Sequence, residues 1–342
     1  MSEYVKVAVD AMGGDFAPAS PVEGAVLALA ESDKLQISLY GRKDVIQKEL
    51  EKYPSYDKER LLIEDCSEVI ETAEPPVMAI RSKKDSSIVR AMLDVKNGKC
   101  DAYVSAGSTG ANLVGGQVLV GRIKGVERPP LAPLIPSAEG PKLLLDCGAN
   151  VDAKPAWLVQ FAKMGSIYMR NIMGIDNPRV GILNIGAEEE KGNALVKETF
   201  PLLKACPDIN FIGSVEARDV PAGVADVIVC DAFAGNILLK TYEGVGGTLL
   251  KDIKGVLMSS VKTKIGALLI KKTLKTKLKK YDLDQYGGAP MLGLSGLVCK
   301  THGSASAKEF KNSILQAIDF KENDITGKIR EAVADSVPEK NE

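Results

Sequence analysis

Five apolar runs of the sequence each end in a small polar or acidic residue. These residues are Asp10, Ser105, Asp146, Asn184 and Asp231, and a glycine follows each of them within four positions. In parallel sheets, ligands bind beyond the carboxyl ends of the strands, and the helix N-termini that follow favour anions. Glycine also serves ordinary turns between a strand and a helix, so one such loop says little. Five together predict a shared cleft that binds an anion.

The predicted anion site consists of glycines and short polar side chains at these turns. Glycine N–H groups, hydroxyls and amides donate hydrogen bonds to phosphate-like oxygens. For each side chain, the alternative is ordinary turn capping. The residues predicted to bind the anion or the substrate are Asp10, Gly13, Gly14, Ser105, Gly107, Ser108, Thr109, Asp146, Asn150 and Asn184.

Three further residues are predicted to act catalytically, namely Lys191, Asn236 and Asp231. Lys191 lies near the start of an expected helix, where a lysine opposes the helix dipole and makes sense if it meets an anion. The Asn236 amide can donate to a developing oxyanion, and Asp231 can orient the lysine or the turn. The alternatives are an exposed lysine, an asparagine that caps a helix and an aspartate that caps a turn.

Several common kinds of active site are disfavoured because their motifs are missing. No G-x-G-x-x-G follows a strand, and the sequence has neither a P-loop nor a G-x-S-x-G motif. The single histidine, His302, lies beside small residues and is interpreted as a turn residue instead of a triad base. The six cysteines form no C-x-x-C pair, so a metal site is also disfavoured. The net charge of −1 gives no overall attraction to nucleic acid.

Short β-branched runs alternate with helical patterns, which is typical of an α/β protein with a mostly parallel sheet and helices on both faces. Strands are expected at 4–10, 35–40, 61–65, 101–105, 143–147, 179–184, 209–213 and 226–230. Helices are expected at 20–31, 43–52, 86–97, 109–121, 155–173, 191–205, 235–258 and 303–319. The first helix should have Ser20 as its cap and Pro21 at its first position. Without a repeat or an obvious linker, the pattern predicts a single large catalytic domain over residues 1–338.

The sequence also bears on the cellular compartment. An acid at position 3 and an immediate strand argue against a signal peptide, and no apolar run approaches 18 residues. Unpaired cysteines in apolar runs, such as Cys230, suit a reducing compartment. We therefore expect a cytoplasmic protein.

Seven stretches together resemble the PlsX-type phosphate acyltransferases of bacterial phospholipid synthesis, and they run in order through nearly the whole chain. They are VAVDAMGGDFAP (7–18), SAGSTGA (105–111), GRIKGVERPPLAP (121–133), LLLDCGANVDAKP (143–155), NIGAEEEKGN (184–193), DAFAGNILLKTYEG (231–244), and YGGAPMLGL with KTHG (286–303).

The resemblance implies an activity and a set of partners. Members of the family convert acyl-[acyl-carrier protein] and inorganic phosphate to acyl phosphate and free carrier protein, and the product feeds a membrane glycerol-phosphate acyltransferase. The resemblance also implies a fold similar to the isocitrate dehydrogenase and phosphotransacetylase group, a homodimer and no organic cofactor. One position departs from the family pattern, because the family usually has histidine after GGD and this sequence has Phe16.

A site that is poor in histidine suits this chemistry. Phosphate is already a dianion near neutral pH, since the second pKa of a phosphate ester is about 6. A thiol with a pKa of about 8.5 leaves without strong acid help. The protein needs only to hold the dianion beside the thioester carbonyl and to stabilise the oxyanion. Phe16 is therefore compatible with activity.

Residues 251–280 form a basic segment with ten lysines and one acid, and apolar residues recur in it at roughly helical spacing. Such a segment suits peripheral association with an anionic membrane, and its lysines could equally dock acidic acyl carrier protein. The alternative is an apolar stripe packed in the core or in a dimer interface. The residues predicted to contact membrane or carrier protein are Lys262, Lys264, Leu268, Leu269, Lys271 and Lys272.

Other functions stay open from the sequence. Phosphate acetyltransfer or acyltransfer with coenzyme A is suggested by DAFAGNILLK, and a non-catalytic membrane-docking scaffold is suggested by the lysine-rich segment and Phe16. A dehydrogenase of the same fold is disfavoured by the missing dinucleotide fingerprint.

Overall fold

The computed structural model describes residues 4–334, and these form two compact units. Among the described residues, unit 1 draws on 4–133, Lys163–Asn177 and 284–334, and unit 2 on Leu134–Ala162 and Pro178–Leu283. Residues 1–3 and 335–338 of the predicted domain lie outside the described residues. That the two units act as one catalytic domain stays a prediction.

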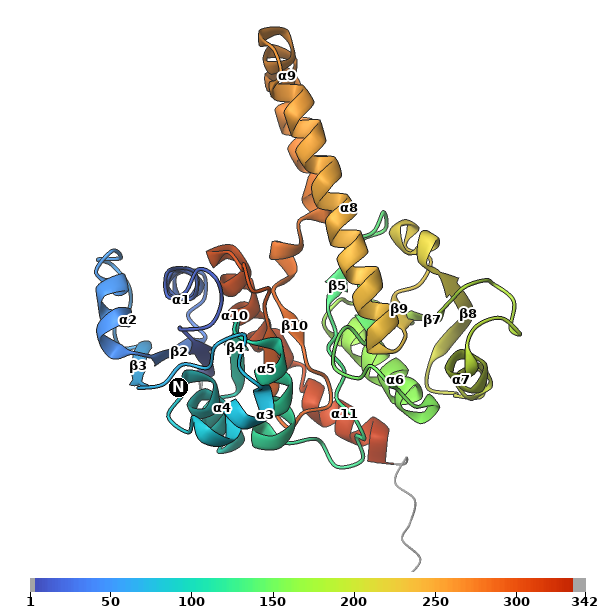
Figure 1. The fold of residues 1–342 in the computed structure, drawn as a ribbon, viewed down its shortest axis with the longest axis horizontal. Coiled ribbons are helices and arrows are strands. Elements are labelled where there is room, and N and C mark those ends of the chain that lie inside the picture. The colour runs from blue at the N-terminus through green and yellow to red at the C-terminus, as the bar shows by residue number, and fades with distance from the viewer. Residues whose placement is uncertain (1–3, 335–342) are drawn as a thin grey trace, which may run out of the picture. The chain divides into compact units, whose positions relative to one another are not determined.

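Unit 1 is built on a six-stranded sheet in the order β10-β11-β4-β1-β2-β3 (Figure 1). Its strands are β1 (Val5–Asp10), β2 (Leu35–Gly41), β3 (Leu61–Asp65), β4 (Ala102–Ser105), β10 (Ala289–Pro290) and β11 (Leu297–Lys300). All neighbours are parallel except β10 and β11. Val7, Ala8 and Val9 of the central strand are fully buried, because helices cover both faces of a parallel sheet.

The helices of unit 1 pack in separate groups on this sheet. They are α1 (Ala19–Glu31), α2 (Lys43–Leu50), α3 (Pro76–Ser82), α4 (Ser87–Lys96), α5 (Thr109–Gly115), a π-helical turn (Gly116–Val120), α10 (Ala307–Glu322) and α11 (Ile325–Ala334). Helices α1 and α10 pack along each other and against β1, whereas α4 packs on β1, β2 and β4. The α/β class predicted from the alternating pattern is confirmed.

Unit 2 has a second, five-stranded sheet in the order β5-β6-β9-β7-β8. Its strands are β5 (Leu134–Ile135), β6 (Lys142–Leu145), β7 (Arg179–Asn184), β8 (Asn210–Glu216) and β9 (Val227–Val229). Only β5 and β6 pair antiparallel. The other helical elements of unit 2 are α7 (Ala194–Lys204), α8 (Ala232–Met258), α9 (Val261–Leu278) and 3-10 turns at Ala217–Ala222 and Lys279–Tyr281. Helix α6 (Pro155–Asn171) and the 3-10 turn Leu283–Tyr286 each have residues in both units.

Helices α8 and α9 form an antiparallel hairpin that extends away from the sheet of unit 2 (Figure 1). The basic segment 251–280 is helical, but it is divided between the two helices at Ser259–Ser260, where Ser260 and Thr263 form a capping box. No residue of α9 is buried, so its apolar side chains do not pack in the core of this chain. None of the helices between residues 4 and 334 combines the length and apolarity needed to cross a membrane.

Some element boundaries differ from the sequence prediction. Helix α1 starts at Ala19, with Pro18 at the cap position and no side-chain cap, so the predicted Ser20 cap is wrong. Helix α8 starts at Ala232, three residues earlier than expected. The elements that were not predicted (α3, α11, β5, β10 and β11) span two to ten residues each. Short elements have too few residues to set up a clear hydrophobic period, so tertiary packing decides them.

Candidate active site

The carboxyl ends of β1 and β4 in unit 1 bring two predicted residues together. Asp10 and Ser105 are almost fully buried, and the Ser105 hydroxyl donates to Asp10 Oδ2 at 2.7 Å. Ser105 Oγ accepts from the Gly107 N–H at 2.9 Å, and Asp10 Oδ1 accepts from the Met12 N–H at 3.1 Å. Burial raises the pKa of Asp10, although hydrogen bonds to its carboxylate oppose the shift. The network therefore fixes the two turns against each other.

Gly13 and Gly14 are required at this junction because backbone fills the space around them. A Cβ on Gly13 would lie 2.3 Å from Asp10 Oδ2 and 2.6 Å from Gly107 N. Gly14 has a φ of +100°, and a Cβ there would lie 2.6 Å from that of Ala106. Any larger residue would separate the two turns, so these glycines permit close approach of backbone.

The other two polar residues predicted to bind the anion after β4, Ser108 and Thr109, differ in their surroundings. Ser108 is the N-cap of α5, and its hydroxyl accepts from the Ala111 N–H at 3.4 Å. Thr109 is exposed at the first position of the helix. Phe16, at the position where the family usually has histidine, is 55% exposed.

Lys300 is a buried residue of this edge that the sequence reasoning missed. It ends β11, pairs in register with Ser105 and is 8% exposed. Its ammonium donates to the carbonyl oxygens of Ala106, at 3.3 Å, and Thr301. The KTHG stretch could have pointed to it, but strand β11 was not predicted, so the lysine was not placed beside β4.

In unit 2, Asp146 holds its own turn after β6. The carboxylate accepts from the Asn150 N–H at 2.8 Å, from the Asn150 amide at 2.7 Å and from the Ala149 N–H at 3.2 Å. Asp146 is fully buried and Asn150 is 7% exposed. The Asn150 carbonyl in turn accepts from the Ala232 N–H at 2.9 Å, which ties this turn to the start of α8.

The start of α8 presents Asn236 and caps itself with Asp231. Asp231 is the N-cap, and its carboxylate accepts from the Ala234 N–H at 2.7 Å. Gly235 is needed because a Cβ would lie 1.9 Å from the carbonyl oxygen of Asp146. Asn236 lies inside the helix, which rules out the alternative that it caps the helix, and its side-chain amide has no hydrogen-bond partner in the described part of the chain. That amide is available to a ligand.

Asn184 positions the loop that carries Lys191. The Asn184 amide donates to the carbonyl of Lys191 at 3.2 Å and to Ser214 Oγ at 3.0 Å. Lys191 lies in the loop before α7, which begins at Ala194 with Asn193 as its cap. Its ammonium pairs with Glu188 at 2.9 Å and is about half exposed, and that hydrogen bond raises the pKa of Lys191. The lysine is therefore charged and accessible.

The remaining candidate nucleophiles and bases have local roles. His302 Nδ1 lies 2.8 Å from Ser304 Oγ within its own turn. Burial raises the pKa of the Cys66 thiol to about 12 and that of Cys100 to about 11, and it also raises the pKa of Cys230. These thiols are poor nucleophiles because the reactive form is the thiolate.

The structure thus joins the predicted residues into two groups, one in each unit. Unit 1 joins Asp10, Ser105 and the glycine turns, and unit 2 joins Asp146 to the α8 start and Asn184 to Lys191. Most of the buried members hold backbone turns, whereas Lys191 and Asn236 keep polar groups accessible. That both groups serve one shared cleft stays a prediction.

Comparison with known proteins identifies the family. Residues 5–328 match the family described as "Fatty acid synthesis protein". A protein named "Phosphate acyltransferase" from Clostridium perfringens (strain SM101 / Type A) is 52% identical over 329 residues, which cover 96% of this chain and 97% of that protein. The chain belongs to this phosphate acyltransferase family. A protein of the same name from Clostridium novyi (strain NT) is also 52% identical, over 95% of this chain and 98% of that protein. The resemblance inferred from the seven stretches is confirmed.

Solved structures show the fold that this acyltransferase family member shares. A phosphotransacetylase from Streptococcus pyogenes superposes with a TM-score of 0.60 and 18% identity, covering 93% of this chain and 94% of that one. The EutD phosphotransacetylase from Staphylococcus aureus gives a TM-score of 0.57 and 16% identity, covering 92% and 93%. At such identities the likeness concerns the fold alone, and it confirms the predicted phosphotransacetylase-like architecture.

Proposed function

We propose that this phosphate acyltransferase family member transfers a fatty acyl group from acyl-[acyl-carrier protein] to inorganic phosphate. The products are acyl phosphate and the free carrier-protein thiol. The observation that carries the proposal is the 52% identity to a protein named phosphate acyltransferase over 96% of the chain. The acyl-carrier-protein donor rests on the sequence resemblance.

The chemistry is a direct transfer without a covalent enzyme intermediate. A phosphate oxygen attacks the thioester carbonyl and forms the new C–O bond, which gives a tetrahedral oxyanion. The oxyanion then collapses to the acyl phosphate as the C–S bond breaks. The leaving thiolate takes a proton from water or from a nearby acid. Because the phosphate dianion needs little activation, the protein contributes mainly orientation and charge stabilisation.

Lys191 and Asn236 have the chemistry for this electrostatic role. The half-exposed Lys191 ammonium can leave Glu188 for an anion, because an exposed ion pair is worth about 0–1 kcal/mol. The unpartnered Asn236 amide can donate to the carbonyl oxygen as it becomes an oxyanion. Asp231 and Asn184 hold the backbone on which these two groups are carried.

A donor-dependence assay tests the proposal. Purified protein is incubated with palmitoyl-[acyl-carrier protein] or palmitoyl-coenzyme A, with and without phosphate, and acyl phosphate is trapped with hydroxylamine. We expect thiol release that requires phosphate and prefers the carrier-protein donor. Preference for coenzyme A would favour the phosphotransacetylase-like alternative. Thioester loss from neither donor would remove the enzymatic proposal and leave the scaffold alternative.

We also propose that the α8–α9 hairpin places the protein at an anionic membrane, where the glycerol-phosphate acyltransferase would take the product. The exposed apolar side chains Val256, Met258 and Val261 near its turn, and Leu268 and Leu269 along α9, support this. A homodimer, implied by the resemblance, is the second possible partner for these side chains. Sedimentation equilibrium of the purified protein tests the dimer, which a monomeric mass at micromolar concentration would exclude.

A further inference from the structure

The carboxyl edge of the unit 1 sheet contains a buried lysine at a junction of three loops. Lys300 follows three apolar residues of β11 and lies beside Ser105 of β4. Placing an ammonium in such a site is costly unless it is well hydrogen-bonded. Its hydrogen-bond acceptors are the carbonyl oxygens of Ala106 and Thr301, and no carboxylate forms an ion pair with it in the described part of the chain.

The three loops around Lys300 are interlocked. The Asp15 N–H donates to the Gly303 carbonyl at 2.8 Å, and the Thr301 N–H donates to the Ser105 carbonyl at 2.9 Å. A Cβ on Gly14 would lie 2.9 Å from that same Gly303 oxygen. The ammonium spans two of these loops, because one acceptor lies on the 105–108 turn and the other on the 301–303 turn.

A second observation at the same junction points to a ligand. The Thr301 hydroxyl is buried, with the residue 1% exposed, and it has no hydrogen-bond partner among residues 4–334. A buried hydroxyl without a partner is destabilising, because it has lost its hydrogen bonds to water and gained none in return. An incoming acceptor such as a phosphate oxygen would satisfy it.

We propose that Lys300 is a positioning residue of the phosphate site, which fixes the 105–108 and 301–303 turns and supplies a buried positive charge for the anion, and that the Thr301 hydroxyl donates to that anion. This inference rests on the proposed function, since it concerns how the phosphate substrate is held. The cation that it names lies in unit 1.

The titratable groups that face Lys300 come from several elements. Asp10 lies on β1, Asp15 on the glycine turn, and Glu309 on α10, where it accepts from the His302 N–H at 2.8 Å; the Cys299 thiol is on β11 itself. Burial lowers the pKa of Lys300, and these groups only partly oppose it, so the pKa is about 8. The lysine is cationic at neutral pH and becomes neutral as the pH rises through about 8. Inorganic phosphate gains negative charge as the pH rises, which would strengthen its binding to a cation, so its own titration does not produce weaker binding at high pH.

The test is the pH dependence of the KM for phosphate from pH 7 to pH 9.5. For the unchanged protein, we expect this KM to rise above about pH 8. Lys300→Met should raise it about tenfold or more at pH 7 with little pH dependence, so that the two proteins converge at high pH. Lys300→Arg should keep the charge and lose the alkaline rise. The KM for the acyl donor should change less than twofold.

Two further variants separate binding from folding. Thr301→Val should weaken phosphate binding while leaving the unfolding temperature equal or higher, because it removes a buried hydroxyl that has no partner. Lys311→Met, at a partly buried lysine of α10 that pairs with the exposed Glu31, is the matched control and should change neither property. A Lys300→Met variant that lowers kcat equally at every pH with unchanged phosphate KM would show a merely structural role and overturn the proposal.

Direct calorimetric titration with inorganic phosphate separates this inference from the proposed function. The unchanged protein should bind phosphate more weakly at pH 9 than at pH 7, and Lys300→Met should bind weakly at both. Equal binding at both pH values overturns the role of Lys300, even if acyltransfer is observed. If no donor is turned over, the proposed function fails, while this binding difference still decides the inference.

Discussion

At the scale of single residues, Lys191 is the strongest catalytic candidate that the sequence identified. The structure places it on a loop held by Asn184 and pairs it only with the neighbouring Glu188 in the described part of the chain. The loop is compact, because a Cβ on Gly186 would lie 2.6 Å from Lys191 Cδ. An exposed ion pair of this kind stabilises the protein little. We therefore expect Lys191 to act through an anion that its ammonium binds, and not through stability.

We predict that Lys191→Ala lowers kcat by about 100- to 1,000-fold, the typical effect of removing one oxyanion donor. The measurement is the turnover of one acyl donor in the presence of phosphate, monitored by the release of its thiol. Lys204→Ala is the matched control, because Lys204 is an exposed lysine of the same unit that pairs with Glu189 at 2.6 Å. Turnover of the Lys191 variant close to that of the control would remove Lys191 from the mechanism.

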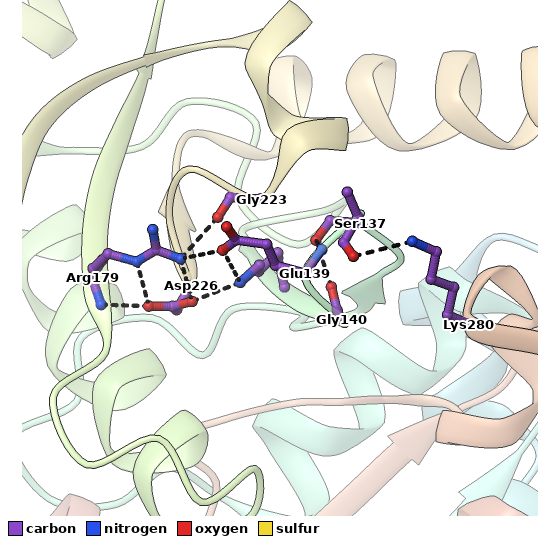
Figure 2. Close-up of polar contacts among 9 residues, drawn as sticks. Ser137, Glu139, Gly140, Arg179, Gly223, Asp226 and Lys280 are labelled. Carbon is purple, nitrogen blue, oxygen red and sulfur yellow. Dashed lines mark hydrogen bonds and ion pairs between the residues drawn. The ribbon is translucent and has the colours of Figure 1, made fainter. Parts of the chain in front are cut away.

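At the scale of elements, the amino ends of β6, β7 and β9 are joined by ion pairs in which Lys142 and Asp226 are buried and Arg179 is partly exposed (Figure 2). Asp226 precedes β9 and lies 2.7 Å from Lys142 Nζ and 3.0 Å from Arg179 Nε. Arg179 also reaches Glu139 at 3.0 Å and the Gly223 carbonyl at 2.9 Å. These residues lie at the opposite ends of the strands from Asn184 and Asp231, so they hold the sheet and not the candidate site.

The pKa of Asp226 makes part of this stability dependent on pH. Burial alone would raise it, but hydrogen bonds from Arg179 and Lys142 outweigh burial and lower it to about 2. A depressed carboxyl pKa stabilises the folded state fully above the unfolded value of about 4. This contribution, about 2 kcal/mol, is lost as the pH falls toward 2.

We predict that Asp226→Asn lowers the stability of the protein by about 3–5 kcal/mol at pH 7, because the buried Lys142 ammonium then keeps only the Glu139 carboxylate, at 3.9 Å. Adding Lys142→Met should recover most of the loss. Urea unfolding followed by circular dichroism measures both. Arg218→Gln, at an exposed pair of the same unit, should change stability by less than about 1 kcal/mol. A similarly small change for Asp226→Asn would contradict the buried-pair argument.

At the scale of the whole molecule, the charge is distributed unevenly. The net charge is −1, yet residues 251–280 hold ten lysines and one acid. The structure places eight of these lysines on α8 and α9 and the other two in the 3-10 turn that follows α9, with exposed Leu268 and Leu269 on α9. A near-neutral protein can therefore present a strongly basic, partly apolar surface.

We predict that the protein binds anionic liposomes at low salt and that exchanging four hairpin lysines for glutamine weakens binding about a hundredfold or more. The lysines are Lys262, Lys264, Lys271 and Lys272, each worth about 1 kcal/mol near an anionic surface. The effect should shrink in high salt, where the Debye length falls to about 3 Å at 1 M. Cosedimentation with phosphatidylglycerol vesicles measures it.

Two controls make this prediction specific. The same exchange at the exposed lysines Lys43, Lys48, Lys96 and Lys124 alters net charge equally and should leave binding within about twofold, because these side chains lie outside the hairpin. Leu268→Ser with Leu269→Ser should weaken binding in low and high salt alike, since apolar insertion is not screened. Binding that the control exchange reduces as much as the hairpin exchange would indicate non-specific attraction only.

Much of the fold could be predicted because the spacing of apolar residues within a single strand or helix already identifies that element. The strand around Val7 and Val9 and the helix around Phe161 repeat their apolar residues at spacings that identify each element without its neighbours. The roles of individual polar residues could not be predicted in the same way. Asp146 was a candidate for ligand contact and Asp231 for orienting the lysine or the turn, and the structure shows the oxygens of both accepting from backbone N–H groups of their own turns.

By itself, the sequence determined the family, the α/β class and the strand ends at which polar residues gather. VAVDAMGGDFAP, SAGSTGA and DAFAGNILLK carry this information because glycine and a short polar residue after an apolar run encode a tight turn locally. Only the tertiary structure decided which of those residues hold backbone turns in place and which keep their polar groups accessible. Lys300 shows the reason: its burial and its lowered pKa arise only when β11 pairs with β4 and two distant loops meet around its ammonium.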